Sequence, residues 1–144
     1  MSIFAVNFMT MVKCLDVVAG VIMHDNKVLC VKKGTTRYDY TSNKWEFPGG
    51  KTEQGETHEQ ALARELREEL NMNVRVGKHL VSVNHTYPDF NITLHAYVCC
   101  AESNSVTLKE HVAMQWVVPK DLTELDWCEA DIAIAQAASL LPSR

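Results

Sequence analysis

The sequence predicts an α+β fold in which two helices pack on a β-sheet of mixed strand directions. Three observations predict it. Apolar, β-branched runs lie near the N-terminus and at residues 92–100, an amphipathic helical pattern follows Gly50, and an alanine-rich helical pattern lies near the C-terminus. With 144 residues and no internal repeat or linker, we predict a single domain over residues 13–144. Residues 1–12 are expected to be a loosely held N-terminal extension, or an upstream start before Met11.

The N-terminal half predicts a hairpin followed by a loop and a bend. Residues 15–23 and 27–32 have strand composition, and residues 24–26 between them have turn composition. Residues 34–43 are polar and predict a loop, and residues 44–47 predict a short extended piece. Pro48 should end that piece, and Gly49 and Gly50 should supply backbone freedom.

A helix is predicted to open at residues 56–57 and to run to about Leu70. Thr57 is a suitable N-cap, Gln60 is its capping-box partner, and Asn71 suits the position after the helix end. Further strands are predicted within residues 73–85 and over 92–100, 105–108 and 114–118. One helical turn is expected at 120–125 and a second helix at 131–141.

Composition excludes some classes of function. Hydrophobic residues make up 47% and charged residues 22%, and the net charge of −4 argues against a basic surface for a nucleic-acid polymer. No apolar stretch approaches the ~20 residues of a membrane span. The five cysteines are odd in number and form no CxxC pair, which favours buried, inert thiols and a reducing, cytoplasmic setting.

The predicted first helix carries a row of carboxylates. Glu68 and Glu69 fall on either side of Glu65, next to an apolar stripe of leucines that should face the core. Like charges at this spacing cost about 0.2–0.5 kcal/mol per pair, which a divalent cation would offset. The alternative is a solvated, salt-bridged helix, which RELREEL by itself would favour. The upstream segment WEFPGGK favours the metal, because its backbone carbonyls would add the oxygen ligands that Mg²⁺ prefers.

The whole stretch resembles the Nudix hydrolase signature. The matching residues, in the family's spacing, are Gly50, Glu56, Arg64, Glu65, Leu66, Glu68, Glu69 and Met72. Asn71 stands where the family has glycine, and asparagine also tolerates the left-handed conformation expected there. The resemblance implies an α/β/α sandwich with a central mixed β-sheet, from about residue 13 onward.

WEFPGGK looks like the MutT-like nucleoside triphosphate pyrophosphohydrolases, in the branch of CTP and 8-oxo-dGTP diphosphatases. The resemblance implies hydrolysis of a small nucleotide substrate to monophosphate and pyrophosphate. It implies Mg²⁺ or Mn²⁺ held by Glu65, Glu68, Glu69 and a carbonyl of Gly49 or Gly50. Arg64 would orient the glutamates, Glu56 would support them, and Lys51 would lie near the metal and phosphates.

Four residues outside the glutamate row are further candidates, and the resemblance implies the first three by their positions in the family. Glu110 would bind metal or act as base, against the alternative of an exposed loop charge. Lys33 would contact phosphates, against a solvated strand end. Asp131 would read the base, or cap the last helix, or do both. Phe47 would stack on a base, although it, like Tyr87 and Trp127, also suits the core.

Two alternative functions remain open at this point. One is hydrolysis of a dinucleotide diphosphate such as ADP-ribose or NADH, although no extra specificity element follows the signature. The other is a non-catalytic nucleotide-binding module, although such modules usually lose signature glutamates. The histidines form no H-x-E or H-E-x-x-H pattern, so no metal role is assigned to them. The chain is expected to act as a monomer or homodimer, without a membrane.

Overall fold

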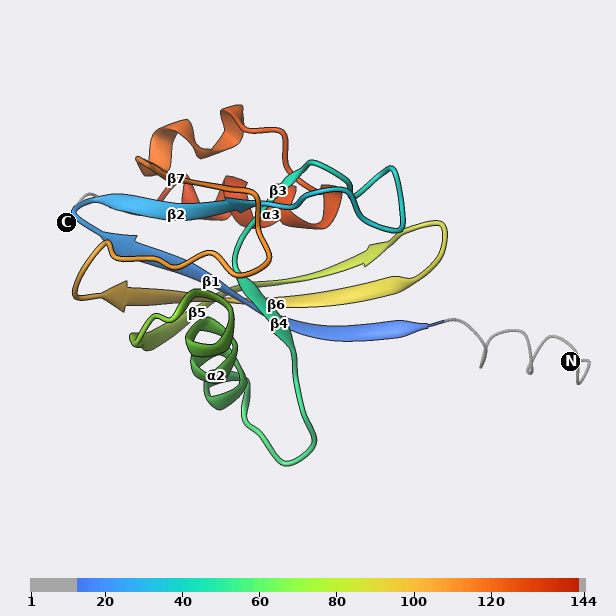
Figure 1. The fold of residues 1–144 in the computed structure, drawn as a ribbon, viewed down its shortest axis with the longest axis horizontal. Helices are drawn as coiled ribbons and strands as arrows, with labels where there is room; N and C mark the ends of the chain where they lie inside the picture. Colours follow the sequence, from blue (N-terminus) through green and yellow to red (C-terminus); the bar gives the residue numbers. More distant parts are fainter. Residues whose placement is uncertain (1–12, 143–144) are drawn as a thin grey trace, which may run out of the picture.

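A computed structural model describes residues 13–142, which form a twisted mixed sheet with helices on both faces (Figure 1). The elements in chain order are β1 (Cys14–His24), β2 (Lys27–Lys32), β3 (Trp45–Glu46), β4 (Gly49–Lys51), α2 (His58–Leu70), β5 (Val74–Thr86), β6 (Asn91–Ala101), β7 (Ala113–Val117), the 3₁₀ helix η1 (Pro119–Glu124) and α3 (Glu129–Ala138). Helix α2 covers one face, and α3 with η1 covers the other. The predicted α/β/α sandwich is confirmed.

The described strands join in the order β3-β2-β1-β6-β5, with β4 added to β1 and β7 added to β2. Strands β1 and β6 run parallel from the pair Cys14↔Asn91 to the pair Met23↔Cys100. The other pairings are antiparallel. The sheet is therefore mixed, as the sequence predicts, and β1 lies at its centre.

The first hairpin has the predicted turn. Asp25 and Asn26 have φ values of 49° and 63°, and His24 pairs with Lys27 across them. Two successive positive φ values match the twist of the flanking strands, and Asp and Asn tolerate them better than most residues.

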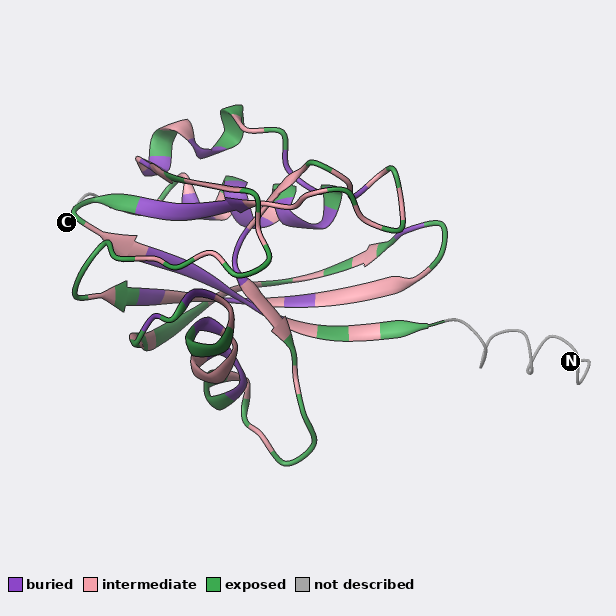
Figure 2. Cartoon of the chain, viewed as in Figure 1, coloured by how far each residue is buried: buried purple, intermediate pink, exposed green. Residues whose placement is uncertain are grey.

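Strand β1 divides the core between the two helix layers because successive side chains point to opposite faces of the sheet. Val18 and Ile22 belong to the apolar cluster beneath α2. Ala19 and Val21 belong to the cluster beneath α3. The buried segments in Figure 2 accordingly gather in the middle of β1 and β2 and on the inner sides of the helices.

Helix α2 has the predicted ends. The Thr57 hydroxyl accepts from the Gln60 N–H at 3.1 Å, and the Gln60 side chain accepts from the Thr57 N–H at 3.0 Å. Asn71 closes the helix with φ 53° and donates its N–H to the Arg67 carbonyl at 3.1 Å. Asn71 thus adopts the left-handed conformation that glycine usually provides.

Two predicted segments differ from the structure. Residues 105–108 are not a strand. The Thr107 N–H donates to the Leu70 carbonyl at 3.0 Å, and Val106 and Leu108 pack on the α2 cluster. The alternation of apolar Val106 and Leu108 with polar residues therefore belongs to a loop that packs against α2, and not to a strand. Helix α3 begins at Glu129 and ends at Ala138, within three residues of the predicted bounds.

The thiols are only partly as predicted. Cys30, Cys99 and Cys128 are buried, and burial raises the pKa of each thiol to about 12. Cys14 and Cys100 are exposed, because the alternation of β6 turns Cys100 away from the interior that holds Cys99. None of the helices within residues 13–142 has the length and apolar character needed to cross a membrane.

Candidate active site

A cavity of about 620 Å³ opens beside the centre of the sheet. Its lining combines carboxylates, glycine backbone and aromatic side chains; among them are Glu65, Glu69, Glu110, Gly49, Gly50, Lys51, Lys33, Glu46, His111, Asp131, Phe47 and Tyr87. All but one of the residues proposed from the sequence to touch metal or substrate therefore lie around one cavity. The exception is Glu68, which does not line it.

Gly49 and Gly50 are required by space and not by backbone freedom. Neither has a positive φ, and both belong to β4, which pairs with β1. A Cβ on Gly49 would collide with the Val18 carbonyl, and a Cβ on Gly50 would collide with the Glu65 carboxylate. The expectation that Gly49 and Gly50 supply backbone freedom is wrong, because the two glycines form a strand pressed against β1 and against α2.

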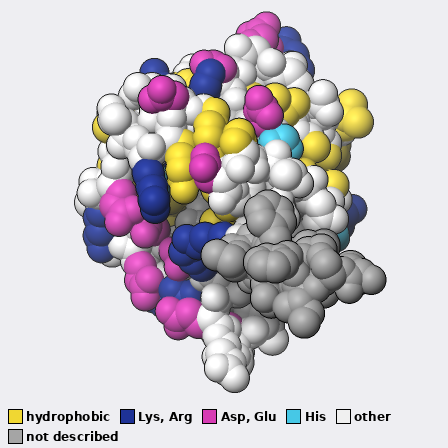
Figure 3. Space-filling view, turned by 90° about the vertical axis from the view of Figure 1, so that its right-hand side faces the viewer, with side chains coloured by type: hydrophobic (Ala, Val, Ile, Leu, Met, Phe, Trp, Pro, Cys, Tyr) yellow, Lys and Arg dark blue, Asp and Glu magenta, His cyan; other side chains and the backbone are white. Residues whose placement is uncertain are grey.

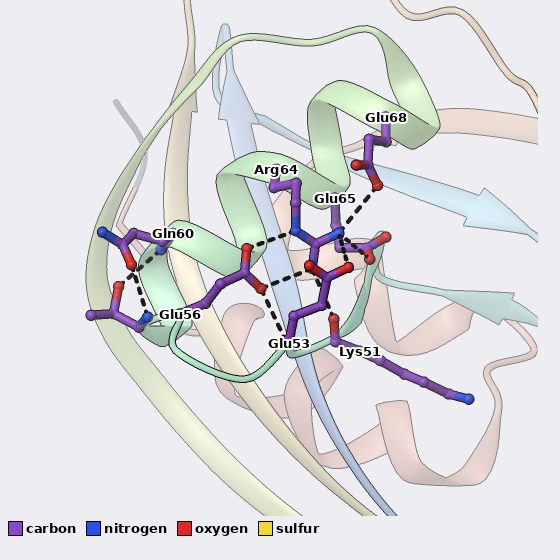
Figure 4. Close-up of polar contacts among 8 residues, drawn as sticks. Lys51, Glu53, Glu56, Gln60, Arg64, Glu65 and Glu68 are labelled. Atoms are coloured by element: carbon purple, nitrogen blue, oxygen red, sulfur yellow. Dashed lines mark hydrogen bonds and ion pairs between the residues drawn. The ribbon is translucent and has the colours of Figure 1, made fainter.

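Arg64 connects the carboxylates of α2 with the loop that precedes the helix (Figure 4). Its Nε donates to Glu56 Oε2 at 2.7 Å and its Nη2 to Glu56 Oε1 at 3.0 Å. Its Nη1 donates to Glu65 Oε1 at 2.9 Å, and its Nη2 donates to the Lys51 carbonyl at 3.1 Å. The guanidinium fork therefore fixes Glu65 relative to β4.

The Arg64–Glu56 ion pair is largely shielded from solvent, which strengthens the interaction between the two charges. The side chains of Arg64 and Glu56 are only 17% and 18% exposed. The hydrogen bonds from Arg64 lower the pKa of Glu56, against the opposing effect of burial. The same pairing raises the pKa of Arg64. The lowered pKa favours ionised Glu56, which holds the Arg64 guanidinium in place. Glu56 therefore supports the carboxylate site through Arg64.

Glu68 lies apart from the other two glutamates of the row. Its carboxylate is 58% exposed and accepts from Arg64 Nη1 at 3.1 Å. Figure 4 shows it approaching Arg64 from the turn of α2 that follows Glu65. Arg64 and Glu68 therefore form an i,i+4 ion pair on α2.

Glu69 and Glu110 both line the cavity, and their charges interact there. Burial raises the pKa of Glu69, and the neighbouring charges of Glu110 and Glu65 raise it further, while His111 acts in the opposite direction. Burial also raises the pKa of Glu65, which the Arg64 guanidinium partly offsets. The structure therefore gathers three carboxylates, two of them from one helix face, with more negative charge than the protein itself neutralises.

These donors fit a hard divalent cation. The carboxylates of Glu65, Glu69 and Glu110 and the backbone oxygens of β4 offer oxygen ligands of the kind that Mg²⁺ and Mn²⁺ bind. A cation there would offset the negative charge that these carboxylates bring together. It would also remove the repulsion that raises the pKa of Glu69.

A second group of charges surrounds Asp131. The Asp131 carboxylate is buried, and its Oδ2 accepts from the Phe47 N–H at 2.9 Å. Burial and the nearby Glu46 carboxylate hold the pKa of Asp131 well above its usual range, against the Phe47 N–H and Lys33. Asp131 is the third residue of α3, after the N-cap position Cys128. The predicted capping role is therefore wrong, because the Asp131 side chain instead bonds the backbone of Phe47, between β3 and β4.

Lys33 belongs to the same group. Its Nζ lies 3.6 Å from Glu46 Oε1. Burial alone would lower the pKa of Lys33, but Glu46, Cys128 and Asp131 together raise it. Lys33 is therefore a charged residue of the cavity wall and not a solvated strand end.

The aromatic residues are mainly core. The rings of Phe47 and Trp127 stack at 4.4 Å between centroids, and both side chains are buried. Tyr87 is buried too, and its hydroxyl accepts from the Ala130 N–H at 2.9 Å. Phe47 and Tyr87 still present an edge to the cavity. Lys51 is exposed, and its side chain points away from Arg64 in Figure 4.

Glu46 and His111 line the cavity, although the sequence analysis gave them no role. His111 Nε2 lies 2.9 Å from Glu46 Oε2, and His111 also acts on Glu69. The pair therefore connects the Glu69 group with the Asp131 group. Glu46 belongs to the WEFPGGK segment, so its position in that segment could have indicated a role at the site. No pattern in the sequence indicated His111.

Three other residues that the sequence did not connect meet elsewhere. Asp16, His58 and His95 place one potential metal-ligand atom each within 4.8 Å of one another. They come from β1, α2 and β6, so no local motif revealed them.

Comparisons with known proteins find similar proteins over most of the chain. Residues 15–137 match the family model described as NUDIX domain. The chain is 34% identical over 125 residues to the CTP pyrophosphohydrolase of Escherichia coli, covering 87% of this chain and 91% of the relative. It is 38% identical over 98 residues to the 8-oxo-dGTP diphosphatase of Proteus vulgaris, covering 68% and 87%. The solved structure of the E. coli ORF135 protein superposes with a TM-score of 0.74 at 33% identity, covering 89% and 90%.

Proposed function

This chain belongs to the NUDIX domain family, and we propose that it hydrolyses nucleoside or deoxynucleoside triphosphates to the monophosphate and pyrophosphate. The observation that carries the proposal is the meeting of Glu65, Glu69 and Glu110 at one cavity with the buried Asp131. The named activities of the two relatives, CTP pyrophosphohydrolase and 8-oxo-dGTP diphosphatase, support the same substrate class.

Members of this family generally need a divalent metal, and we assign Mg²⁺ or Mn²⁺ to the carboxylate side of the cavity. Glu65, Glu69 and Glu110 would hold it, with a carbonyl of Gly49 or Gly50. Glu68 would join them after leaving Arg64, since its carboxylate is exposed and close by. When bound, such an ion neutralises phosphate charge and activates water.

The protein's own residues then have separate tasks. Arg64 holds Glu65 against β4, which fixes one carboxylate before substrate arrives. Lys51, exposed at the cavity rim, would attract the phosphate chain. Glu110 and Glu69 both line the cavity, so we assign to one of them the removal of a proton from an attacking water.

The base would lie at the Asp131 side of the cavity. One oxygen of Asp131 is committed to the Phe47 N–H, which leaves the other for a base edge. The raised pKa of Asp131 favours its protonated form, which both donates and accepts hydrogen bonds. Ionised Asp131 would select the exocyclic amine of cytosine, and protonated Asp131 would suit an oxidised guanine. Lys33 would balance the charge of Asp131 and Glu46 there.

The test is steady-state turnover of CTP, dCTP, 5-methyl-dCTP, dGTP and 8-oxo-dGTP with Mg²⁺, for the wild type and for Glu69→Gln. We expect pyrophosphate release from at least one of these triphosphates. Glu69→Gln should lose at least ~10²-fold in kcat, because metal charge stabilisation contributes several kcal/mol. The matched control is Glu59→Gln, an acidic residue of α2 that does not line the cavity. Background turnover on the whole panel by folded wild type would refute the proposal.

The cellular setting is also a proposal. Mixed acidic and basic side chains, and not one basic surface, surround hydrophobic side chains on the face in Figure 3. That surface suits a small nucleotide better than a polymer. We place the protein in the cytoplasm, where the exposed thiol of Cys100 would stay reduced. We propose one domain over residues 13–144, acting as a monomer or homodimer; the expected extension at residues 1–12 lies outside the described residues.

A further inference from the structure

A cluster of two imidazoles and a carboxylate lies outside the cavity, on the face of the sheet that α2 covers. Leu15, Val17 and Leu94 line the cavity. Asp16 alternates with the first two along β1, and His95 follows Leu94 along β6, so both point to the α2 face. His58, the first residue of α2, completes the cluster.

The ligand atoms are spaced as a metal site requires. His95 Nε2 lies 2.9 Å from Asp16 Oδ1, and His58 Nε2 lies 3.7 Å from Asp16 Oδ2. Zinc–nitrogen bonds of about 2.0–2.1 Å in a tetrahedron place neighbouring ligand atoms about 3.3 Å apart. The two measured distances lie on either side of that value. The two imidazole rings stack with 4.2 Å between centroids, and the Nε2 atom of each lies near the Asp16 carboxylate.

Each potential ligand side chain also forms a hydrogen bond with a hydroxyl group outside the cluster. His95 Nδ1 lies 2.8 Å from the Ser82 hydroxyl, and His58 Nδ1 lies 3.2 Å from the Tyr97 hydroxyl. The Thr52 hydroxyl donates to Asp16 Oδ2 at 3.2 Å. Such outer hydrogen bonds orient the imidazoles of metal sites and fix their tautomer.

The Ser82 hydroxyl also allows the tautomer that metal binding needs. Without metal, His95 Nε2 donates its proton to Asp16 across 2.9 Å. To bind a cation through Nε2, the ring must carry its proton on Nδ1 instead. The Ser82 hydroxyl can accept that proton, because a hydroxyl serves as donor or acceptor.

From this arrangement we infer that Asp16, His58 and His95 form a second metal site, for a first-row transition dication of the Zn²⁺ class. Two imidazoles and one carboxylate select such ions, whereas Mg²⁺ prefers an all-oxygen set. Three protein ligands leave a fourth position for water. The site differs from the carboxylate site in its ligands, and Asp16, His58 and His95 do not line the cavity.

The site would join β1, β6 and the start of α2. The segment between Thr52 and Thr57 leads from β4 into α2 and carries Glu53 and Glu56, both partners of Arg64. A cation bound to the folded protein but not to the unfolded chain raises its stability by mass action. Zn²⁺ would therefore hold the catalytic helix to the sheet without touching the cavity.

The test is calorimetric titration of Zn²⁺ into the full-length protein in saturating Mg²⁺, with thermal melting in parallel. Excess Mg²⁺ occupies the carboxylate site, so the titration reports the histidine cluster. We expect one tight Zn²⁺ site and a Zn²⁺-dependent rise in melting temperature. His58→Gln and His95→Gln should each weaken this site at least ~10²-fold, and Ser82→Ala at least ~10-fold.

The matched controls separate this site from other ligands. His24→Gln removes a histidine of β1 that lies outside the cluster and whose Nδ1 is 2.9 Å from the Ala101 carbonyl oxygen. It should leave Zn²⁺ affinity unchanged. Cys14→Ser and Cys100→Ser test the exposed thiols, and Glu69→Gln tests the carboxylate site; none should abolish the tight site. Loss in any of these three with retention in His58→Gln would overturn the proposal.

Co²⁺ provides a second readout that does not depend on stability. Tetrahedral coordination by nitrogen and oxygen gives a strong visible absorption, whereas an octahedral oxygen site gives a weak one. The strong band should appear in the wild type and disappear in His58→Gln and Asp16→Asn, provided that both variants melt cooperatively. Zn²⁺ affinity and Co²⁺ spectra that stay the same in those variants would contradict the site.

Discussion

Single residues decide the shape of the carboxylate site, and Gly50 shows this most directly. The Glu65 carboxylate occupies the space that a Cβ on residue 50 would need. Arg64 holds that carboxylate from the other direction at 2.9 Å. The position of Glu65 therefore depends both on the space left by Gly50, which has no side chain, and on the hydrogen bond from Arg64.

Gly50→Ala should displace Glu65. We expect a loss of about 1–3 kcal/mol of unfolding free energy from overpacking, together with weaker Mg²⁺ activation. Gly55→Ala is the control, because Gly55 has φ 86° with open space around its Cβ position. It should cost about 1–2 kcal/mol of backbone strain without changing Mg²⁺ activation. Mg²⁺ titration of turnover, with urea unfolding, compares them; equal Mg²⁺ activation in both variants would contradict the role of Gly50.

Asp131 should make the stability of the protein depend on pH. Its folded-state pKa is raised by burial and Glu46, so the folded state binds more protons than the unfolded chain. Its contribution is fully present below the unfolded pKa of about 3.9 and is lost as pH rises through the folded pKa. The wild type should lose up to about 1.4 kcal/mol per pH unit within that window relative to Asp131→Asn. Urea unfolding of both proteins from pH 4 upward measures the difference; parallel curves would rule out a raised pKa.

At the scale of elements, the helix that carries the glutamates is the best-predicted part. The capping box of Thr57 and Gln60 and the left-handed Asn71 are local signals, and the structure has all three. The helix ends depend on residues within a few positions of each other, so the sequence is sufficient to predict them. Glycine-rich β4 was missed because its glycines suggest a turn, while their actual role depends on β1 and α2.

Thr57→Ala tests the cap. It removes the hydroxyl that accepts from the Gln60 N–H, so unfolding free energy should fall by about 1 kcal/mol. Thr57→Ser keeps the hydroxyl and should restore most of that stability. Urea unfolding measures both. Equal losses in the two variants would show that the cap does not stabilise α2.

At the scale of the whole molecule, the site is assembled from distant segments. The signature residues were predictable because they lie within one helix and the strand before it. The Glu46–His111 pair spans 65 positions, and the Asp16–His95 pair spans 79. Such contacts depend on strand order and on the parallel pairing of β1 with β6. Neither local spacing nor composition records that order, so these residues could be found only in the folded protein.

The central claim is that the residues of the carboxylate cavity hydrolyse a nucleoside triphosphate between its α- and β-phosphates. The most direct measurement is ³¹P NMR of the products formed from the best substrate, with and without Mg²⁺. We expect nucleoside monophosphate and pyrophosphate in equal amounts, formed only with the metal. Nucleoside diphosphate with inorganic phosphate, or equal product formation without any divalent ion, would contradict the account.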